Sequence, residues 1–406
     1  MNQKGGTPID LRREGLLPQE EMLEIETKKQ EMVIGIPRED AERESRVPLT
    51  PEAVEILTGH GHQLIIETHA GDAANYPDNQ YAESGALITE SRKDVFRADV
   101  VLKIDPPKIR DIEMMKERLV LISSFQARTL TDRKYIETLI RKRVTAISME
   151  RIRDEHMCFP LIRSMSGIAG NTAVLVAGEY LSNVRGGKGV MLGGITGITP
   201  TEVVILGAGT VAEFAVRAAL GMGASVKVFD ESIQRLRRLQ SAVGTNIPTS
   251  IFHPKVIEKA LKSADVVIGA VRNDGDDPSF FITEEMVMGM KKGSVIVDVS
   301  IDHGGCVATS EPRTQKNPVF TKHGVVHYCV PNIPSRVART ASIAISNVVS
   351  PMLKNMGRLG GLSLHLKADD GLRHGVYIYN GILTNHSIGN RFGIPSKDIE
   401  LLMAAF

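Results

Sequence analysis

The 406-residue sequence predicts an α/β fold with two domains, each built on a parallel sheet and separated by a cleft. Short runs of β-branched and aliphatic residues alternate with helical patterns along most of the chain. Residues 203–230 form one complete unit of strand, glycine turn, helix and strand. Enough chain follows this unit to return to the first domain. We therefore divide the molecule into residues 1–160 plus 339–406 and residues 161–338.

The first 150 residues contain the strands of the first predicted sheet. Thr50 as N-cap and Pro51 at the first helical position predict the start of a helix. This region has no glycine fingerprint, so we interpret it as the substrate domain. Its strands are expected at Val33–Ile36, Leu64–Glu67, Val100–Ile104, Leu119–Ser123 and Val144–Ser148.

Residues 203–230 have the form of a Rossmann-like dinucleotide-binding unit. A buried strand leads into a G-x-G-x-x-A turn, in which Gly207 permits the tight turn and Gly209 permits the approach of a pyrophosphate. Ala212 keeps the following helix close to the strand. A second strand ends at Asp230, where a carboxylate accepts the ribose hydroxyls and repels a 2′-phosphate. The sequence therefore predicts NAD rather than NADP.

The rest of the second domain follows the same alternation. A long helix is expected from residues 165–170 through Leu181, ahead of the nucleotide unit. Further strands are expected at Val266–Ala270, Val295–Val299 and Val325–Val330. After this domain, another long helix is expected over residues 341–357, in the segment that returns to the first domain.

Composition narrows the class of protein. The net charge is +1, and no basic stripe interleaved with aromatics occurs, which argues against a nucleic-acid partner. No apolar run reaches the length of a membrane span, and the three cysteines share no C-x-x-C spacing. We therefore expect a cytoplasmic protein. The pairs His156/Cys158 and His327/Cys329 have no third ligand nearby, so we expect core residues and no metal site.

Four polar side chains are placed where a substrate would lie. Lys103 interrupts an apolar strand end, and Arg46 follows the first strand with a guanidinium suited to a carboxylate. Asp302 is expected at the end of a strand, where it can orient water or an amine. Asn332 follows the last strand of the second domain and can bind the cofactor carboxamide or the substrate. His303 is a general-base candidate by residue type alone.

These motifs resemble alanine dehydrogenases and, more broadly, the family shared with the α subunit of nicotinamide nucleotide transhydrogenase. The similarity extends from about residue 31 to residue 406. It implies an NAD-dependent, reversible oxidative deamination of L-alanine to pyruvate and ammonia, in a two-domain subunit commonly assembled as a hexamer. It rests on residues 44–51, 98–103, 165–170, 298–306, 330–334 and 383–385, and on the fingerprint that ends at Asp230.

The resemblance also implies roles for individual residues. Arg46 and Lys103 correspond to the residues that hold the substrate carboxylate and carbonyl, and Asp302 corresponds to a catalytic aspartate. Asn332 corresponds to a residue that lines the site. The expected cofactor-binding residues are Ser166, Gly207, Gly209, Ala212, Asp230, Val271 and Asn332.

One position departs from the family pattern. Gln126 stands where the family has its catalytic histidine, and glutamine cannot exchange a proton near neutral pH. Proton transfer then passes through Lys103, Asp302 or water, or alanine turnover is slow. Two alternatives stay open: a dehydrogenase of another amino or imino acid, and an NAD(H)-binding homologue with little catalytic activity.

Overall fold

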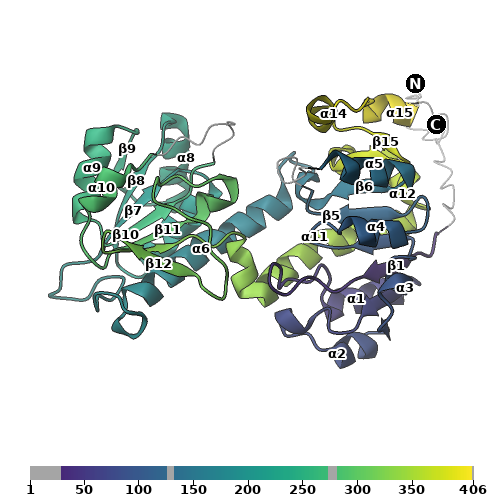
Figure 1. The fold of residues 1–406 in the computed structure, drawn as a ribbon, viewed down its shortest axis with the longest axis horizontal. Coiled ribbons are helices and arrows are strands. Elements are labelled where there is room, and N and C mark those ends of the chain that lie inside the picture. Colours follow the sequence, from purple (N-terminus) through teal and green to yellow (C-terminus); the bar gives the residue numbers. More distant parts are fainter. Residues whose placement is uncertain (1–28, 126–131, 273–280, 405–406) are drawn as a thin grey trace, which may run out of the picture.

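The computed structural model describes residues 29–125, 132–272 and 281–404. Two α/β lobes are joined by two long helices, α6 (Pro160–Leu181) and α11 (Ala338–Arg358) (Figure 1). Helix α6 leads from the first lobe into the second, and α11 leads back. The chain therefore ends on the first lobe, and the prediction of two α/β sheets with a returning C-terminal segment is confirmed.

The first lobe contains an eight-stranded sheet in the order β15-β14-β6-β5-β4-β1-β2-β3. Strands β1 to β6 pair in parallel, whereas β14 runs antiparallel to β6 and β15. The strands are β1 (Val33–Ile36), β2 (Gln63–Glu67), β3 (Leu87–Thr89), β4 (Val100–Leu102), β5 (Val120–Ser123), β6 (Thr145–Ser148), β14 (Val376–Tyr379) and β15 (Ile382–Leu383).

Helices cover this sheet and carry the chain between its strands. Helix α1 begins at Pro51 as predicted, but the Thr50 side chain makes no capping hydrogen bond. Instead the Thr50 backbone N–H donates to Ser346 Oγ on α11, 3.2 Å away. The described helices are α1 (Pro51–Gly59), α2 (Asp78–Glu83), α3 (Arg92–Val95), α4 (Ile109–Met114), α5 (Arg133–Arg141), α12 (Leu362–Ala368), α13 (Asp370–Arg373), α14 (His386–Phe392) and α15 (Ile399–Ala404).

The second lobe contains a seven-stranded sheet in the order β12-β13-β11-β10-β7-β8-β9. Its strand order reverses between β7 and β10, which is where α/β sheets of this kind bind ligands. The strands are β7 (Glu202–Leu206), β8 (Ser225–Phe229), β9 (Thr249–Ser250), β10 (Val266–Gly269), β11 (Val295–Asp298), β12 (Val319–Lys322) and β13 (Val325–Tyr328). The helices are α7 (Thr210–Gly221), α8 (Ile233–Val243), α9 (Pro254–Ser263) and α10 (Glu284–Met288).

The predicted parallel sheets are confirmed for most strands, but antiparallel pairs occur at the β12 end of one sheet and at the β14–β15 end of the other. Strand β12 pairs antiparallel with β13, and β14 with β15, each through a two-residue turn. In each turn both residues have positive φ. The angles are 55° at His323 and 80° at Gly324 in the first turn, and 48° at Asn380 and 80° at Gly381 in the second. Such turns match the twist of paired strands, and the Asn-Gly dipeptide is a strong hairpin signal that the sequence analysis overlooked.

Close helix packing supports the nucleotide unit. Strands β7, β10 and β11 are buried almost throughout, and their aliphatic side chains fill both faces of the sheet. Helix α6 lies against α7, where a Cβ on Gly170 would stand 2.3 Å from the carbonyl oxygen of Val211. Glycine at this position therefore lets the two helix backbones approach each other, and their contact sets the position of α7.

Other expectations concern metal sites and membrane spans. Cys158 is exposed on the loop before α6, so the prediction that His156 and Cys158 are core residues is wrong. His327 is buried, and its Nε2 lies 2.7 Å from Thr309 Oγ1. In the described ranges no group of three or more histidine, cysteine or acidic side chains is arranged around a common metal position. Within those same ranges, no helix combines the length and apolar character that crossing a membrane requires.

Candidate functional site

The glycine turn between β7 and α7 has the geometry that dinucleotide binding requires. Gly207 has φ of +103°, and a Cβ there would stand 2.4 Å from the carbonyl oxygen of Ala270. Gly209 is the N-cap of α7, and a Cβ on it would meet no described atom within 4 Å. The backbone is thus open beside the first N–H groups of α7, which suits an anionic pyrophosphate. Ala212 is fully buried against the sheet, as expected.

Asp230 follows β8 and is buried beside this turn. Its Oδ2 accepts the N–H of Ala208 at 2.7 Å, and its Oδ1 accepts the N–H of Ser232 at 2.7 Å. Oδ1 also pairs with Arg235 Nε at 2.9 Å, while Arg235 Nη2 pairs with Glu231. The sequence analysis missed this ion pair. The position of Arg235, five residues after Asp230, could have suggested it. Two acidic groups and one basic group leave this corner with a net negative charge.

Val271 lies at the point where the strand order reverses. It follows β10, and its N–H donates to Ser300 Oγ at 3.0 Å. The same nitrogen would stand 3.2 Å from a Cβ on Gly207. Val271 and the glycine turn are therefore adjacent, although they are far apart in the sequence.

Arg46 lies in the loop after β1 and is buried. Its Nε and Nη2 donate to the two carboxylate oxygens of Glu44 at 2.7 and 2.6 Å, and its Nη1 donates to Met165 Sδ at 3.3 Å. Met165 and its neighbour Ser166 belong to α6. Burial opposes ionisation of Glu44, but the charge and hydrogen bonds of Arg46 outweigh it and hold the pKa of Glu44 below its usual range. Sequence reasoning missed Glu44, two residues before Arg46.

Lys103 directly follows β4 and is also buried. Its Nζ donates to Glu39 Oε2, and the other oxygen of Glu39 accepts the N–H of Ile104 at 2.6 Å. Burial raises the pKa of Glu39 to about 7, against the opposing charge and hydrogen bond of Lys103. The expectation of a lysine at the strand end is confirmed, but Glu39, which holds its ammonium group, was missed.

Glu39, Glu44, Arg46 and Lys103 line one cavity of about 530 Å³ in the first lobe. Charged groups of both signs line it, which is the lining that binding of a small zwitterion requires. Gln126 lies outside the described residues.

Asp302 and Asn332 connect the second lobe to this cavity. Asp302 lies in a 3₁₀ turn, Val299–His303, so its predicted position at a strand end is wrong. The strand stops at Asp298 because the Asp298 side chain accepts the N–H of Ser300 and so caps the turn. Asp302 Oδ1 accepts the backbone N–H of Asn332 at 2.8 Å, and Asn332 Nδ2 donates to Glu44 Oε2 at 2.9 Å.

This chain of hydrogen bonds crosses between the lobes. It links Asp302, Asn332, Glu44 and Arg46 in that order. Although Asp302 stays accessible to solvent, partial loss of hydration raises its pKa above the ordinary aspartate value, while the Asn332 N–H and Arg46 lower it. The structure thus brings together three of the predicted site residues, and Lys103 lines the same cavity as Arg46.

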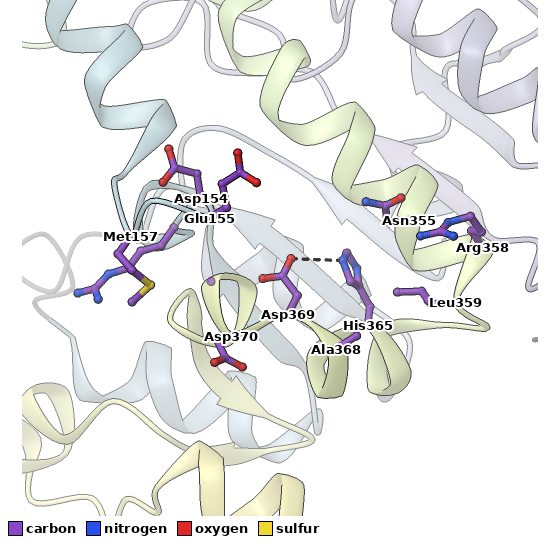
Figure 2. Close-up of a pocket in the computed structure, with 12 residues that line it drawn as sticks. Asp154, Glu155, Met157, Asn355, Arg358, Leu359, His365, Ala368, Asp369 and Asp370 are labelled. Atoms are coloured by element: carbon purple, nitrogen blue, oxygen red, sulfur yellow. Dashed lines mark ion pairs between the residues drawn. The ribbon is translucent and has the colours of Figure 1, made fainter. Parts of the chain in front are cut away.

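A second cavity, of about 560 Å³, lies between the loop before α6 and helices α11 and α12 (Figure 2). It contains no predicted site residue, and its acidic side chains already serve the local fold. Asp369 caps α13 through the N–H of Leu372, and its Oδ2 lies 3.6 Å from His365 Nε2. Asp154 accepts the N–H groups of His156 and Cys158. We therefore place the candidate site in the first cavity.

Comparison with protein families matches both halves of the chain. Residues 35–169 match the family model described as "Alanine dehydrogenase/PNT, N-terminal domain", and residues 173–386 match its C-terminal counterpart. An alanine dehydrogenase of Staphylococcus epidermidis is 35% identical over 370 residues, which cover 91% of this chain and 99% of that protein. Alanine dehydrogenase 2 of Staphylococcus aureus is 36% identical over 373 residues, with the same coverage.

Solved structures show the same likeness. A structure titled L-alanine dehydrogenase superposes with a TM-score of 0.82 at 35% identity, covering 89% of this chain and 99% of that one. A transhydrogenase from Sinorhizobium meliloti superposes with a TM-score of 0.73 at 22% identity, covering 87% of this chain and 99% of that one. The second likeness concerns the fold alone.

Proposed function

The chain belongs to the alanine dehydrogenase/PNT family, and from this we propose that it catalyses the reversible, NAD-dependent oxidative deamination of L-alanine to pyruvate and ammonia. The observation that carries the proposal is the hydrogen-bonded chain from Asp302 through Asn332 and Glu44 to Arg46. It joins the nucleotide-binding lobe to the cavity that contains Lys103. A reaction between a bound dinucleotide and a small amino acid needs this proximity.

Arg46 and Lys103 bind the substrate. A guanidinium has five N–H groups, and Glu44 and Met165 accept from three different nitrogens of Arg46. One N–H on Nη1 and one on Nη2 remain to donate to the substrate carboxylate, although the charges of Glu150 and Glu39 also act on Arg46. Lys103 donates to the developing carbonyl oxygen, and Asp302 orients the attacking water or, in the reverse direction, ammonia. NAD, when bound, supplies the hydride acceptor.

Residues 161–338 bind NAD in this proposal, and residues 1–160 plus 339–406 bind the amino acid. The open backbone at Gly209 accommodates the pyrophosphate, and Gly207, Ala212 and Val271 shape the turn around it. Ser166 on α6 contacts the cofactor near Met165. The Asp230 carboxylate faces the ribose, and the net negative charge around it favours NAD over NADP.

We also propose a homo-oligomer, a hexamer, which the family resemblance and a set of exposed apolar side chains support. Five large apolar side chains on α6 and the segment that follows it are between 53% and 89% exposed. Exposed apolar patches of this kind mark protein interfaces. The exposed apolar side chains are Leu175, Val184, Met191, Ile195 and Ile198. The three cysteines are free thiols, which fits the reducing cytoplasm.

Incubation of the purified protein with NAD and a panel of L-amino acids tests the function. We expect NADH and pyruvate to form in equal amounts from L-alanine, and no product from D-alanine. Turnover of another amino acid alone would redirect the proposal to a different substrate, a reading that Gln126 keeps open. Tight NADH binding without any turnover would favour a non-catalytic homologue.

A further inference from the structure

Glu39 and Lys103 form a buried ion pair inside the candidate site. Both side chains are only 5% exposed, and Lys103 Nζ donates to Glu39 Oε2. The N–H of Ile104 fixes the second carboxylate oxygen at 2.6 Å. The carboxyl group is therefore held in one orientation and paired with Lys103, and both side chains line the cavity that Arg46 shares.

Burial, balanced against nearby charges, leaves Glu39 able to gain or lose a proton near neutral pH. Its pKa is raised to about 7, mainly by burial and in smaller part by the neighbouring Glu44 carboxylate. Lys103 and the Ile104 N–H lower the pKa of Glu39. The attraction between Arg46 and Glu39 likewise favours the charged carboxylate. Proton transfer is most efficient when the pKa of the group lies near the working pH.

The family pattern places a histidine where this chain has Gln126, so the site needs another group that exchanges protons. Asp302 lies on the opposite lobe and is hydrogen-bonded to Asn332. Resting on the proposed dehydrogenase function, we propose that Lys103 takes a proton from the substrate oxygen and passes another to Glu39. Lys103 is then the catalytic residue, and Glu39 is a positioning residue that acts through it.

The proton transfer accompanies release of ammonia. After hydride transfer and addition of water, the substrate carbon carries a hydroxyl and an ammonium group. The O–H bond breaks, its proton moves to Lys103 Nζ, and Lys103 gives one of its protons to Glu39 Oε2. The oxygen electron pair forms the carbonyl bond while the C–N bond breaks and its electron pair leaves with ammonia. Glu39 later releases the proton to solvent, so the cycle needs no oxidant besides NAD.

Glu39→Gln tests the relay because it keeps the shape of the side chain and removes its ability to take a proton. We expect kcat for alanine oxidation to fall about 10²–10⁴-fold, the usual contribution of a positioned acid or base. The wild-type rate should decrease as the pH is lowered below about 7, because Glu39 becomes protonated. This acidic limb of the pH–rate profile should disappear in the variant. Glu39→Asp should restore part of the rate together with the limb.

Asp40→Asn provides the matched control. Asp40 is the adjacent acid, but it pairs with Lys108 at the exposed rim, and the hydrogen bond from Lys108 holds the pKa of Asp40 below its usual range. This variant should keep both the rate and the acidic limb. All variants should bind NADH as the wild type does, by fluorescence titration. An unchanged limb in Glu39→Gln would assign it to Asp302 and overturn the relay.

Infrared difference spectra across pH give a reading that does not depend on turnover. A protonated-carboxyl band should appear below about pH 7 in the wild type and be missing in Glu39→Gln. Alanine turnover without this band would defeat the relay and leave the proposed function standing. A titrating band in a protein that turns over no amino acid would defeat the proposed function and the relay with it.

Discussion

Replacing Gly209 by alanine separates cofactor binding from folding. Gly209 has φ of −83°, which any residue adopts, and the new Cβ would meet no described atom within 4 Å. The loss of a favourable N-cap residue costs about 1 kcal/mol at most. The methyl group would, however, stand in the space that we assign to the pyrophosphate. Overpacking of that kind costs about 1–3 kcal/mol, so NADH should bind roughly 5- to 150-fold more weakly.

Two neighbouring glycines provide contrasting variants. Gly207→Ala combines positive φ with a Cβ 2.4 Å from the Ala270 carbonyl oxygen, so it should destabilise the lobe by about 2–5 kcal/mol. Gly221, at the end of α7, has nothing within 4 Å of a Cβ. Its replacement by alanine should stabilise the helix by about 0.5–1 kcal/mol and leave NADH affinity unchanged.

The assay combines thermal unfolding without cofactor and fluorescence titration with NADH on all three variants. Gly209→Ala should unfold close to the wild-type temperature and bind NADH weakly. Wild-type affinity in this variant would refute the placement of the pyrophosphate over the β7–α7 turn. If Gly209→Ala bound NADH weakly and also unfolded at a clearly lower temperature, the separation of cofactor binding from folding would be refuted.

The remaining predictions concern charged and polar groups of the site. Wild-type protein should bind NADH much more tightly than NADPH in fluorescence titrations. Asp230→Ala should reduce that preference about tenfold, because Arg235 then remains to attract a 2′-phosphate. Equal affinities in the wild type would show that Asp230 does not face the ribose. Lys103→Ala should abolish turnover with NADH affinity nearly unchanged, and surviving activity would remove Lys103 from the site. Gln126→His should raise a slow wild-type rate of alanine oxidation by less than the full general-base factor of about 10²–10⁴, measured at steady state across pH. Fast wild-type turnover with no gain from histidine would indicate that another group already carries the proton.

The strands and the glycine turn were predictable because their signals are local. The run Val203–Leu206, the turn at Gly207 and the acid at Asp230 each follow from residue type and spacing, and the structure places them within a residue or two of expectation. The Asn380-Gly381 hairpin was equally local, and the sequence analysis overlooked it.

The partners of the charged residues were not predictable in the same way. Glu44 comes to Asn332 from 288 residues away, and Glu39 comes to Lys103 from 64 residues away. Periodicity along the chain carries no information about which loops meet across a sheet edge. The sequence therefore indicated that Arg46 and Lys103 carry charge into the site, and only the fold revealed that each is held by a buried glutamate.

The central claim is hydride transfer from the α-carbon of L-alanine to a bound nicotinamide. L-Alanine deuterated at that carbon, incubated with the protein and NAD, tests it most directly. Mass spectrometry should find one deuterium in each NADH molecule formed and none in the pyruvate. NADH without the label, or no NADH although the protein binds NAD, would contradict the claim.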